Sequence, residues 1–229
     1  MNSTVTEYSE ETIIQKILEG ETGLFELLVR RHNALLYKIG RSYGFLHEDA
    51  KDLLQETHIA AFRSLNKFES RSSYKTWIAK IMVNKCLYKM KYGSFKYEVS
   101  QENVDEKALP LFSANYQRND GTVNKELASI LEKSLDNIPP HYRTVFIMRE
   151  VEGFSVAETS ALLELTEVNV KVRLSRAKTM LQQELEKHYS KAQLYEFNLV
   201  YCDEVVKNVM EEIRNVEQET RNNEQEQGM

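Results

Sequence analysis

Apolar residues recur at three- and four-residue spacing along almost the whole chain, which is the pattern of one face of an α-helix. No segment alternates apolar and polar residues over more than a few positions, as a half-buried strand would. Glycine and proline, with 8 and 3 residues among 229, are scarce. The pattern therefore predicts an all-α protein.

Four helices are predicted in the first part of the chain. Ser9 is a suitable N-cap for the first helix, and Gly20 is a stop signal at its end. Glu48 and Asp49 favour the start of the third helix, because carboxylates are stabilised at the positive end of a helix dipole. The expected ranges are 10–20, 22–42, 48–66 and 74–93.

The rest of the chain divides into three further segments. Residues 94–124 show little periodicity and hold turn-forming residues, which indicates a linker. A helix is then expected to end at Asn137, and Pro139-Pro140 separates it from a helix over 141–152. The predicted organisation is a helical domain over 1–97, a flexible acidic linker over 98–124, a helical domain with a helix-turn-helix over 125–188, and a C-terminal helical extension over 189–229 that is disordered after about residue 215.

Residues 155–178 carry the most informative pattern, two short helices around a turn. Ser155 and Glu158 form a capping box for the first helix, and Thr166 is an N-cap for the second. One side of the second helix is apolar, and the other side is polar and basic. The polar and basic positions are Asn169, Lys171, Arg173, Ser175, Arg176 and Lys178. Such a helix suits the major groove of duplex DNA, although an ordinary solvated amphipathic helix has the same periodicity.

A second constellation lies on the helix over 74–93. Trp77, Lys80, Asn84, Tyr88 and Lys91 share one face, where aromatic rings offer stacking surfaces for bases and lysines neutralise phosphates. A core anchor is the alternative role for the tryptophan. The polar loop over 67–73, just before this helix, has the size and chemistry to receive a base turned out of the stack.

The net charge of −5 conceals an uneven distribution. Residues 24–97 hold fourteen bases and six acids, whereas residues 98–137 hold four bases and eight acids. The first 23 residues carry −4, residues 138–188 are neutral, and residues 189–229 carry −5. A basic block and a separate basic helix suggest two modules that meet a polyanion.

Several classes of protein are disfavoured by composition. The two cysteines, Cys86 and Cys202, are too few for a disulfide framework, and no signal peptide or membrane-spanning run is apparent. These features predict a cytoplasmic protein without membrane insertion. The five histidines lack metal-ligand spacing, and no phosphate loop or nucleophile elbow is present. We therefore expect no metal, no cofactor and no catalytic residue, and hence no enzyme.

Three stretches in order resemble RNA polymerase sigma factors of the extracytoplasmic-function type. DLLQETHIAAFRSLNKF at 52–68 resembles the second conserved region, and SSYKTWIAKIMVNKCLYKMK at 72–91 resembles the segment that opens and reads the upstream strand. Residues 135–181 resemble the fourth conserved region in register. The resemblance covers about two-thirds of the chain and implies a transcription initiation factor whose partners are core RNA polymerase and promoter DNA, with an anti-sigma factor as a candidate regulator.

The resemblance also implies roles for individual residues. The ridge formed by Asp52, Gln55 and Glu56 would dock on the coiled-coil clamp helices of the polymerase. Melted -10 DNA would be bound by Lys67, Phe68, Glu69, Ser70, Arg71, Ser72, Ser73, Tyr74, Trp77, Lys80 and Asn84. The -35 element, as duplex, would be bound by the six polar and basic positions of the second helix at 166–185 given above.

Some positions depart from the family pattern. Members usually have an aromatic residue where this chain has His58, and often have Gly and Thr where it has Val168 and Asn169. Arg is more usual near Glu69. The promoter preferred here is therefore expected to differ from the usual one.

Two other functions are compatible with a helical protein of this charge. A stand-alone helix-turn-helix regulator would bind palindromic duplex sites and self-associate, but no clear dimerisation heptad is present. A helical module that sequesters a protein partner would not need the four bases between residues 168 and 180, where no acid interrupts them.

Overall fold

The computed structural model describes residues 8–92, 123–187, 207 and 209–211, and these residues form helices, turns and loops without a strand. Two compact units are distinguished, Met1–Leu185 and Glu186–Met229. The expectation of an all-α fold with two helical domains is confirmed. The predicted linker and C-terminal extension lie outside the described residues, apart from residues 123–124 at the start of a helix and residues 207 and 209–211, which are helical.

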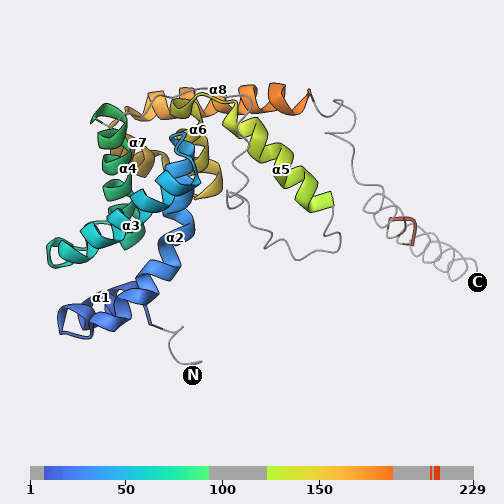
Figure 1. Ribbon diagram of the computed structural model, residues 1–229. Helices are drawn as coiled ribbons and strands as arrows, with labels where there is room; N and C mark the ends of the chain where they lie inside the picture. The colour runs from blue at the N-terminus through green and yellow to red at the C-terminus, as the bar shows by residue number, and fades with distance from the viewer. Residues whose placement is uncertain (1–7, 93–122, 188–206, 208, 212–229) are drawn as a thin grey trace, which may run out of the picture. The chain divides into compact units, whose positions relative to one another are not determined.

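The N-terminal domain contains α1 (Glu10–Leu18), α2 (Phe25–Ser42), α3 (His47–Arg63) and α4 (Tyr74–Tyr92) (Figure 1). Two short 3-10 turns, η1 (Thr22–Leu24) and η2 (Leu65–Lys67), precede α2 and follow α3. The cap predicted for α1 is present, because the Ser9 hydroxyl accepts a hydrogen bond from the Thr12 amide at 3.2 Å. The first and fourth ranges agree with the sequence pattern.

The second and third ranges need correction at one end each. The segment expected to begin α2 at Thr22 is a 3-10 turn, and α3 ends at Arg63 rather than near Asn66. Ser64 leaves helical geometry with a φ of −112°, and its hydroxyl donates to the Ala60 carbonyl at 2.7 Å. Serine competes in this way for backbone groups and so ends helices that apolar spacing alone would extend.

The core of the N-terminal domain lies where α2, α3 and α4 meet. Leu28, Leu36, Ile39, Ile78 and Met82 are all fully buried there. Gly40 allows the close approach of these helices, since a Cβ atom at this position would lie 2.9 Å from the Met82 Cε and 3.2 Å from the Ala50 Cβ. The close packing of α2 against α3 and α4 therefore depends on glycine at position 40.

The C-terminal domain contains α5 (Val123–Asp136), α6 (Pro140–Phe146), α7 (Val156–Leu163) and α8 (Glu167–Leu185). The helix expected over 141–152 begins at Pro140 and widens after Phe146 into a π-helical turn, η3 (Ile147–Val151). Gly153, two residues after this turn, has a φ of +71°, which favours glycine. A second hydrophobic cluster, formed by Leu135, Ile138, Ile147 and Leu181, joins α5, η3 and α8.

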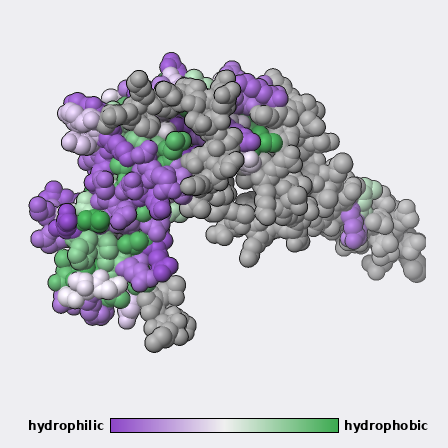
Figure 2. All heavy atoms as spheres, in the orientation of Figure 1, coloured by the Kyte–Doolittle hydropathy of each residue, from purple (hydrophilic) through white to green (hydrophobic). Residues whose placement is uncertain are grey.

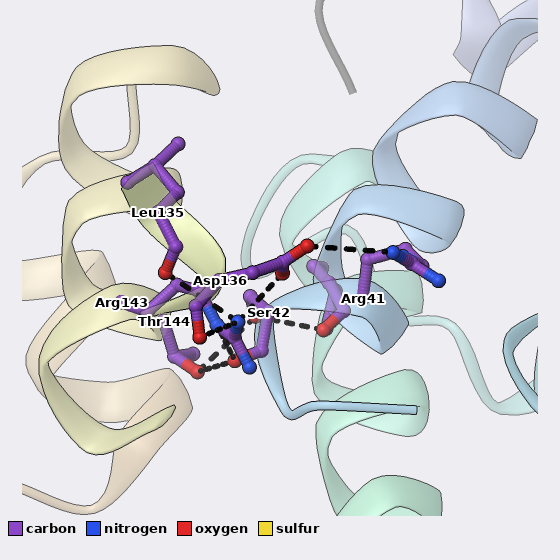
Figure 3. Close-up of polar contacts among 7 residues, drawn as sticks. Arg41, Ser42, Leu135, Asp136, Arg143 and Thr144 are labelled. Atoms are coloured by element: carbon purple, nitrogen blue, oxygen red, sulfur yellow. Dashed lines mark hydrogen bonds and ion pairs between the residues drawn. The ribbon is translucent and has the colours of Figure 1, made fainter. Parts of the chain in front are cut away.

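The two domains are in direct contact at the C-terminal end of α2 (Figure 3). Arg143 of α6 is 2% exposed, and its Nε donates to the Ser42 carbonyl at 2.9 Å. Its Nη1 donates to the Asp136 carboxylate at 2.7 Å, and the Ser42 hydroxyl donates to the Thr144 hydroxyl at 3.1 Å. One buried guanidinium thus links the end of α2 to the end of α5.

Candidate polymerase and nucleic-acid interface

The predicted docking ridge is an exposed stripe on α3. Asp52, Gln55 and Glu56 are exposed, whereas the neighbouring Leu53 and Thr57 are buried. Glu56 is held by the Lys85 ammonium at 2.9 Å. Helical periodicity explains this arrangement, because residues one turn apart share a face and the intervening apolar residues face the core. The structure thus presents all three predicted residues together.

A groove beside the ridge was not predicted from the sequence. It encloses about 850 Å³ between α2 and α3, and its apolar lining includes Phe25, Val29, Leu54, Ile59 and Phe62. Ile59 and Phe62 are 44% and 42% exposed, which is unusual for large apolar side chains. Figure 2 shows hydrophobic surface among hydrophilic surface in the part of the molecule that holds α1–α3. The three-residue spacing of these exposed side chains is the sequence signal for the groove.

His58 lies behind the ridge and lines this groove. Its Nε2 is 2.9 Å from the Asn33 side-chain oxygen, and its ring meets the Phe25 ring edge-on at 6.3 Å. Burial lowers the pKa of His58 from 6.5 to about 4, because the charged imidazolium is poorly solvated there. The side chain is therefore neutral at pH 7, and its buried Nδ1 has no hydrogen-bond partner among the described residues.

The loop over 67–73 surrounds a hollow of about 310 Å³. Phe68, Ser70, Ser72, Ser73 and Tyr74 line one side of it. Ser70 has a φ of +53°, an uncommon value for a residue with a side chain, and Ser73 caps α4 by accepting a hydrogen bond from the Thr76 amide at 3.1 Å. The exposed Glu69 and Arg71 pair with each other at 2.5 Å, and Lys67 is exposed at the end of η2.

The other side of the hollow comes from α1, which the sequence did not connect with this loop. Glu10, Glu11 and Ile14 complete the lining. The buried His32 ring donates from Nε2 to the Glu10 carboxylate at 2.8 Å, and this hydrogen bond lowers the pKa of the Glu10 carboxyl. The hollow thus combines an aromatic wall, serine hydroxyls and carboxylates, which is a set of groups suited to a nucleobase.

Phe68 of the loop packs against two aromatic rings of α4, those of Tyr74 and Trp77. The Phe68 ring centroid lies 5.8 Å from that of Tyr74 and 5.2 Å from that of Trp77, and the latter two are 5.5 Å apart. Tyr74 is only 2% exposed, its hydroxyl has no hydrogen-bond partner within the described part of the chain, and burial raises its pKa. Trp77 is half-buried against the core cluster. Both roles considered for Trp77 are therefore compatible with its position, whereas Tyr74 is a core residue that supports its neighbours.

Further along α4, the predicted residues differ in their surroundings. Asn84 is exposed, and Tyr88 and Tyr92 form an exposed ring pair with centroids 4.8 Å apart. The Lys80 ammonium lies 2.9 Å from the Glu164 carboxylate of the C-terminal domain. Two of the predicted strand-binding residues on this helix therefore differ in their accessibility. Asn84 is open to solvent, whereas Lys80 is engaged in an ion pair within the protein.

The predicted two-helix unit is present in the C-terminal domain. Both hydrogen bonds of the capping box between Ser155 and Glu158 are formed, and the Thr166 hydroxyl accepts from the Asn169 amide at 3.2 Å. Glu164 makes the turn between α7 and α8 with a φ of +55°. Val170, Ala177 and Leu181 are buried, as the spacing predicted.

The polar face of α8 is largely open to solvent. Exposed residues there are Asn169, Lys171, Ser175, Arg176 and Lys178, and Arg173 is half-buried. The Arg176 Nη1 donates to the Tyr142 hydroxyl at 3.2 Å, and the Lys178 ammonium lies 3.1 Å from the Glu150 carboxylate. The structure therefore brings the six predicted residues onto one helix with cations and an amide at its surface.

No group of three or more potential metal ligands occurs within residues 8–92, 123–187 and the short described part of the extension. Among these same residues, no helix combines the length and apolarity needed to span a bilayer.

Two family models match the chain in order along the sequence. The model described as "Sigma-70 region 2" matches residues 28–93, and that described as "Sigma-70, region 4" matches residues 120–181. The first match contains most of α2 together with α3 and α4, and the second contains α5–α7 with most of α8.

Curated relatives and solved structures agree with these matches. The chain is 27% identical over 175 residues to "ECF RNA polymerase sigma factor SigM" of Mycobacterium tuberculosis, which covers 76% of this chain and 84% of that protein. It is 24% identical to "ECF RNA polymerase sigma factor SigW" of Bacillus subtilis, with 75% and 94% covered. Among solved structures, CnrH in complex with the cytosolic domain of CnrY matches with a TM-score of 0.54 at 21% identity, covering 77% of this chain and 97% of that one. The sigma factor RpoE in complex with the anti-sigma factor NepR from Bartonella quintana matches with a TM-score of 0.51 at 24% identity, covering 70% and 93%.

Proposed function

The chain belongs to the extracytoplasmic-function RNA polymerase sigma factors, and on this premise we propose that it binds core RNA polymerase and directs it to specific promoters. The observation that carries the proposal is the ordered match of both sigma regions over residues 28–93 and 120–181. A stand-alone helix-turn-helix regulator is not favoured, since it would not need the first of these regions.

The division of work between the two domains follows from their surfaces. The ridge of Asp52, Gln55 and Glu56 would dock on the polymerase, with the apolar groove beside it adding contact area. The exposed polar face of α8 would lie in the major groove of the -35 duplex, where arginine and asparagine read base edges.

The N-terminal domain would bind the melted -10 strand. A base turned out of the stack would enter the hollow beside the loop over 67–73, and the following bases would run along α4 past Trp77, Lys80 and Asn84. In this role the protein contributes binding free energy to strand opening, and the polymerase performs the chemistry. We accordingly propose a cytoplasmic, non-enzymatic factor that needs no cofactor, and an anti-sigma factor as its regulator.

Reconstituted transcription tests the function directly. The purified chain, mixed with core polymerase and a library of bacterial promoter fragments, is expected to form a complex and to support synthesis of RNA from a subset of the fragments. Failure to bind polymerase, or RNA synthesis that the chain does not change, would remove the proposal.

Two pairs of variants test the residue assignments. Glu56→Ala should weaken the complex with polymerase, whereas Glu48→Ala, which removes an exposed carboxylate from the same helix, should not. Arg176→Ala should weaken binding of the -35 duplex by about 1–3 kcal/mol and relax the preference at one base pair, if the guanidinium reads a base edge. Arg30→Ala removes an equally exposed guanidinium from α2 and is the control.

A further inference from the structure

The hollow beside the loop over 67–73 contains one carboxylate whose position is fixed by a buried partner. Its lining joins the loop and the start of α4 to α1, which contributes Glu10, Glu11 and Ile14. The Glu10 carboxylate accepts a hydrogen bond from the Nε2 of His32 at 2.8 Å, and its side chain is 28% exposed. The neighbouring Glu11 is exposed, and no such bond from the described residues holds its carboxylate. Glu10 is therefore the carboxylate that is held in place for a ligand.

The Glu10 carboxylate is a hydrogen-bond acceptor only. The hydrogen bond from His32 lowers the pKa of its carboxyl, and the charges of Arg31 and Lys75 lower it further, against the opposing effect of burial. An ionised carboxylate has no proton to donate. Since His32 bonds to Oε1, the second oxygen, Oε2, is the one available to accept from a ligand in the hollow.

Tyr74 provides a donor in the lining of the same hollow. Its side chain is 2% exposed, and its hydroxyl has no hydrogen-bond partner among the described residues. Burial and the charge of Glu10 raise the pKa of this hydroxyl, so it keeps its proton. Buried hydroxyls are rarely left unpaired, and an exception at the wall of a cavity indicates a partner that arrives with a ligand.

An acceptor and a donor together distinguish the four bases. A base turned out of the stack is read on its Watson–Crick edge. Adenine and cytosine have an amino group there beside a ring nitrogen that accepts, whereas thymine and guanine have a carbonyl oxygen beside a ring N–H. The carboxylate would attract the amino group and repel the carbonyl oxygen. The serine hydroxyls of the loop both donate and accept, so they do not make this distinction.

We propose that Glu10 selects adenine or cytosine for the hollow, by accepting a hydrogen bond from the amino group while the Tyr74 hydroxyl donates to the adjacent ring nitrogen. The inference rests on the proposed function of the hollow in receiving a base of the melted -10 strand. It also gives α1 a part in promoter recognition, although this helix lies outside the residues 28–93 that match sigma region 2.

Promoter fragments with a randomised, unpaired -10 segment test this selection. The two strands are mismatched throughout the segment, so that differences in base-pairing energy do not contribute. Holoenzyme reconstituted from core polymerase and the full chain is mixed with the pool, and the bound fragments are sequenced. At one position of the segment, adenine and cytosine should be enriched about tenfold over thymine and guanine, as expected for a hydrogen bond to a charged group.

A pair of variants connects that position with Glu10. Glu10→Gln should abolish the preference there and leave the preferences at other positions unchanged, because an amide can also donate to a carbonyl oxygen. Glu19→Gln is the control, since it removes an exposed carboxylate from the end of the same helix, outside the hollow, and should keep the preference.

A change in the DNA tests the same contact without a change in the protein. Purine is adenine without its amino group, and it should bind about tenfold more weakly than adenine at the selected position. This measurement with the unaltered chain decides the matter where Glu10→Gln weakens the binding of every fragment alike.

Three results would overturn the selection while the proposed function stands. They are enrichment of thymine or guanine at the position that Glu10→Gln affects, a Glu10→Gln holoenzyme with the original preference at every position, and equal affinity for purine and adenine. If the chain forms no complex with core polymerase, or the complex binds no fragment, the proposed function fails and the selection fails with it.

Discussion

Replacement of His58 by phenylalanine should make the stability of the protein less sensitive to acid. The imidazole is buried, and its pKa is lowered from 6.5 to about 4 in the folded chain. Because the unfolded chain binds this proton more tightly, the free energy of unfolding falls as pH decreases through the window between about 6.5 and 4. Above that window the stability is fully present, since the group is neutral in both states.

The size of the effect follows from the shift. One pKa unit corresponds to about 1.36 kcal/mol, so the whole window is worth at most about 3.4 kcal/mol. At about pH 4.5 roughly 2.5 kcal/mol of this loss in stability should be visible. The variant loses the hydrogen bond to Asn33 at every pH, which moves its curve by about 1 kcal/mol without changing the slope.

Urea denaturation followed by circular dichroism at several pH values between about 7.5 and 4.5 measures the difference. The wild-type curve should fall more steeply than the variant curve, because all other titrating groups are common to both. The ring-proton chemical shifts of His58 provide a direct reading of the same pKa. Parallel stability curves, or a ring that titrates near its ordinary pKa of 6.5, would refute the reasoning.

Three further changes test the packing. Gly40→Val should destabilise the protein by more than about 2 kcal/mol in thermal or urea unfolding, because its side chain would overlap Met82, whereas Gly23→Val, with nothing within 4 Å, should change it little. Ser155→Ala removes the capping hydrogen bond at the start of α7 and should cost about 1 kcal/mol in the same assay; an unchanged melting temperature would contradict the role of the cap. Arg143→Met should cost about 3 kcal/mol, since three backbone carbonyls and the Asp136 carboxylate each lose one donor, and a variant as stable as the wild type would show that this contact is dispensable.

Features set by neighbouring residues were predictable from the sequence. The caps at Ser9, Ser155 and Thr166 depend on side chains three residues apart, and each forms the hydrogen bond that its spacing predicts. The exposed ridge on α3 and the polar face of α8 follow from helical periodicity alone. These local rules placed most helix ends correctly, and the residues of both candidate surfaces are largely exposed, as helical periodicity predicts.

Features set by distant residues were not predictable in this way. The partner of Lys80 is Glu164, 84 residues away, and no periodicity connects the two. Tyr74 carries an aromatic ring that could stack on a base, yet it is buried against α2, where its ring centroid lies 5.2 Å from that of His32. The π-helical turn after Phe146 likewise arises where the chain fits between two clusters, a tertiary effect that overrides local propensity.

The ion pair between Lys178 and Glu150 affects how the protein should respond to ionic strength. A lysine that approaches DNA from bulk solvent displaces a counterion from the duplex, and this release makes affinity fall steeply with added electrolyte. When a lysine must first break an ion pair with a carboxylate, the carboxylate is left without a partner and binds a cation from solution. The cation taken up offsets the one released from the duplex. Although α8 carries four bases between residues 168 and 180, its affinity for duplex DNA should therefore depend on electrolyte concentration as that of a helix with three would.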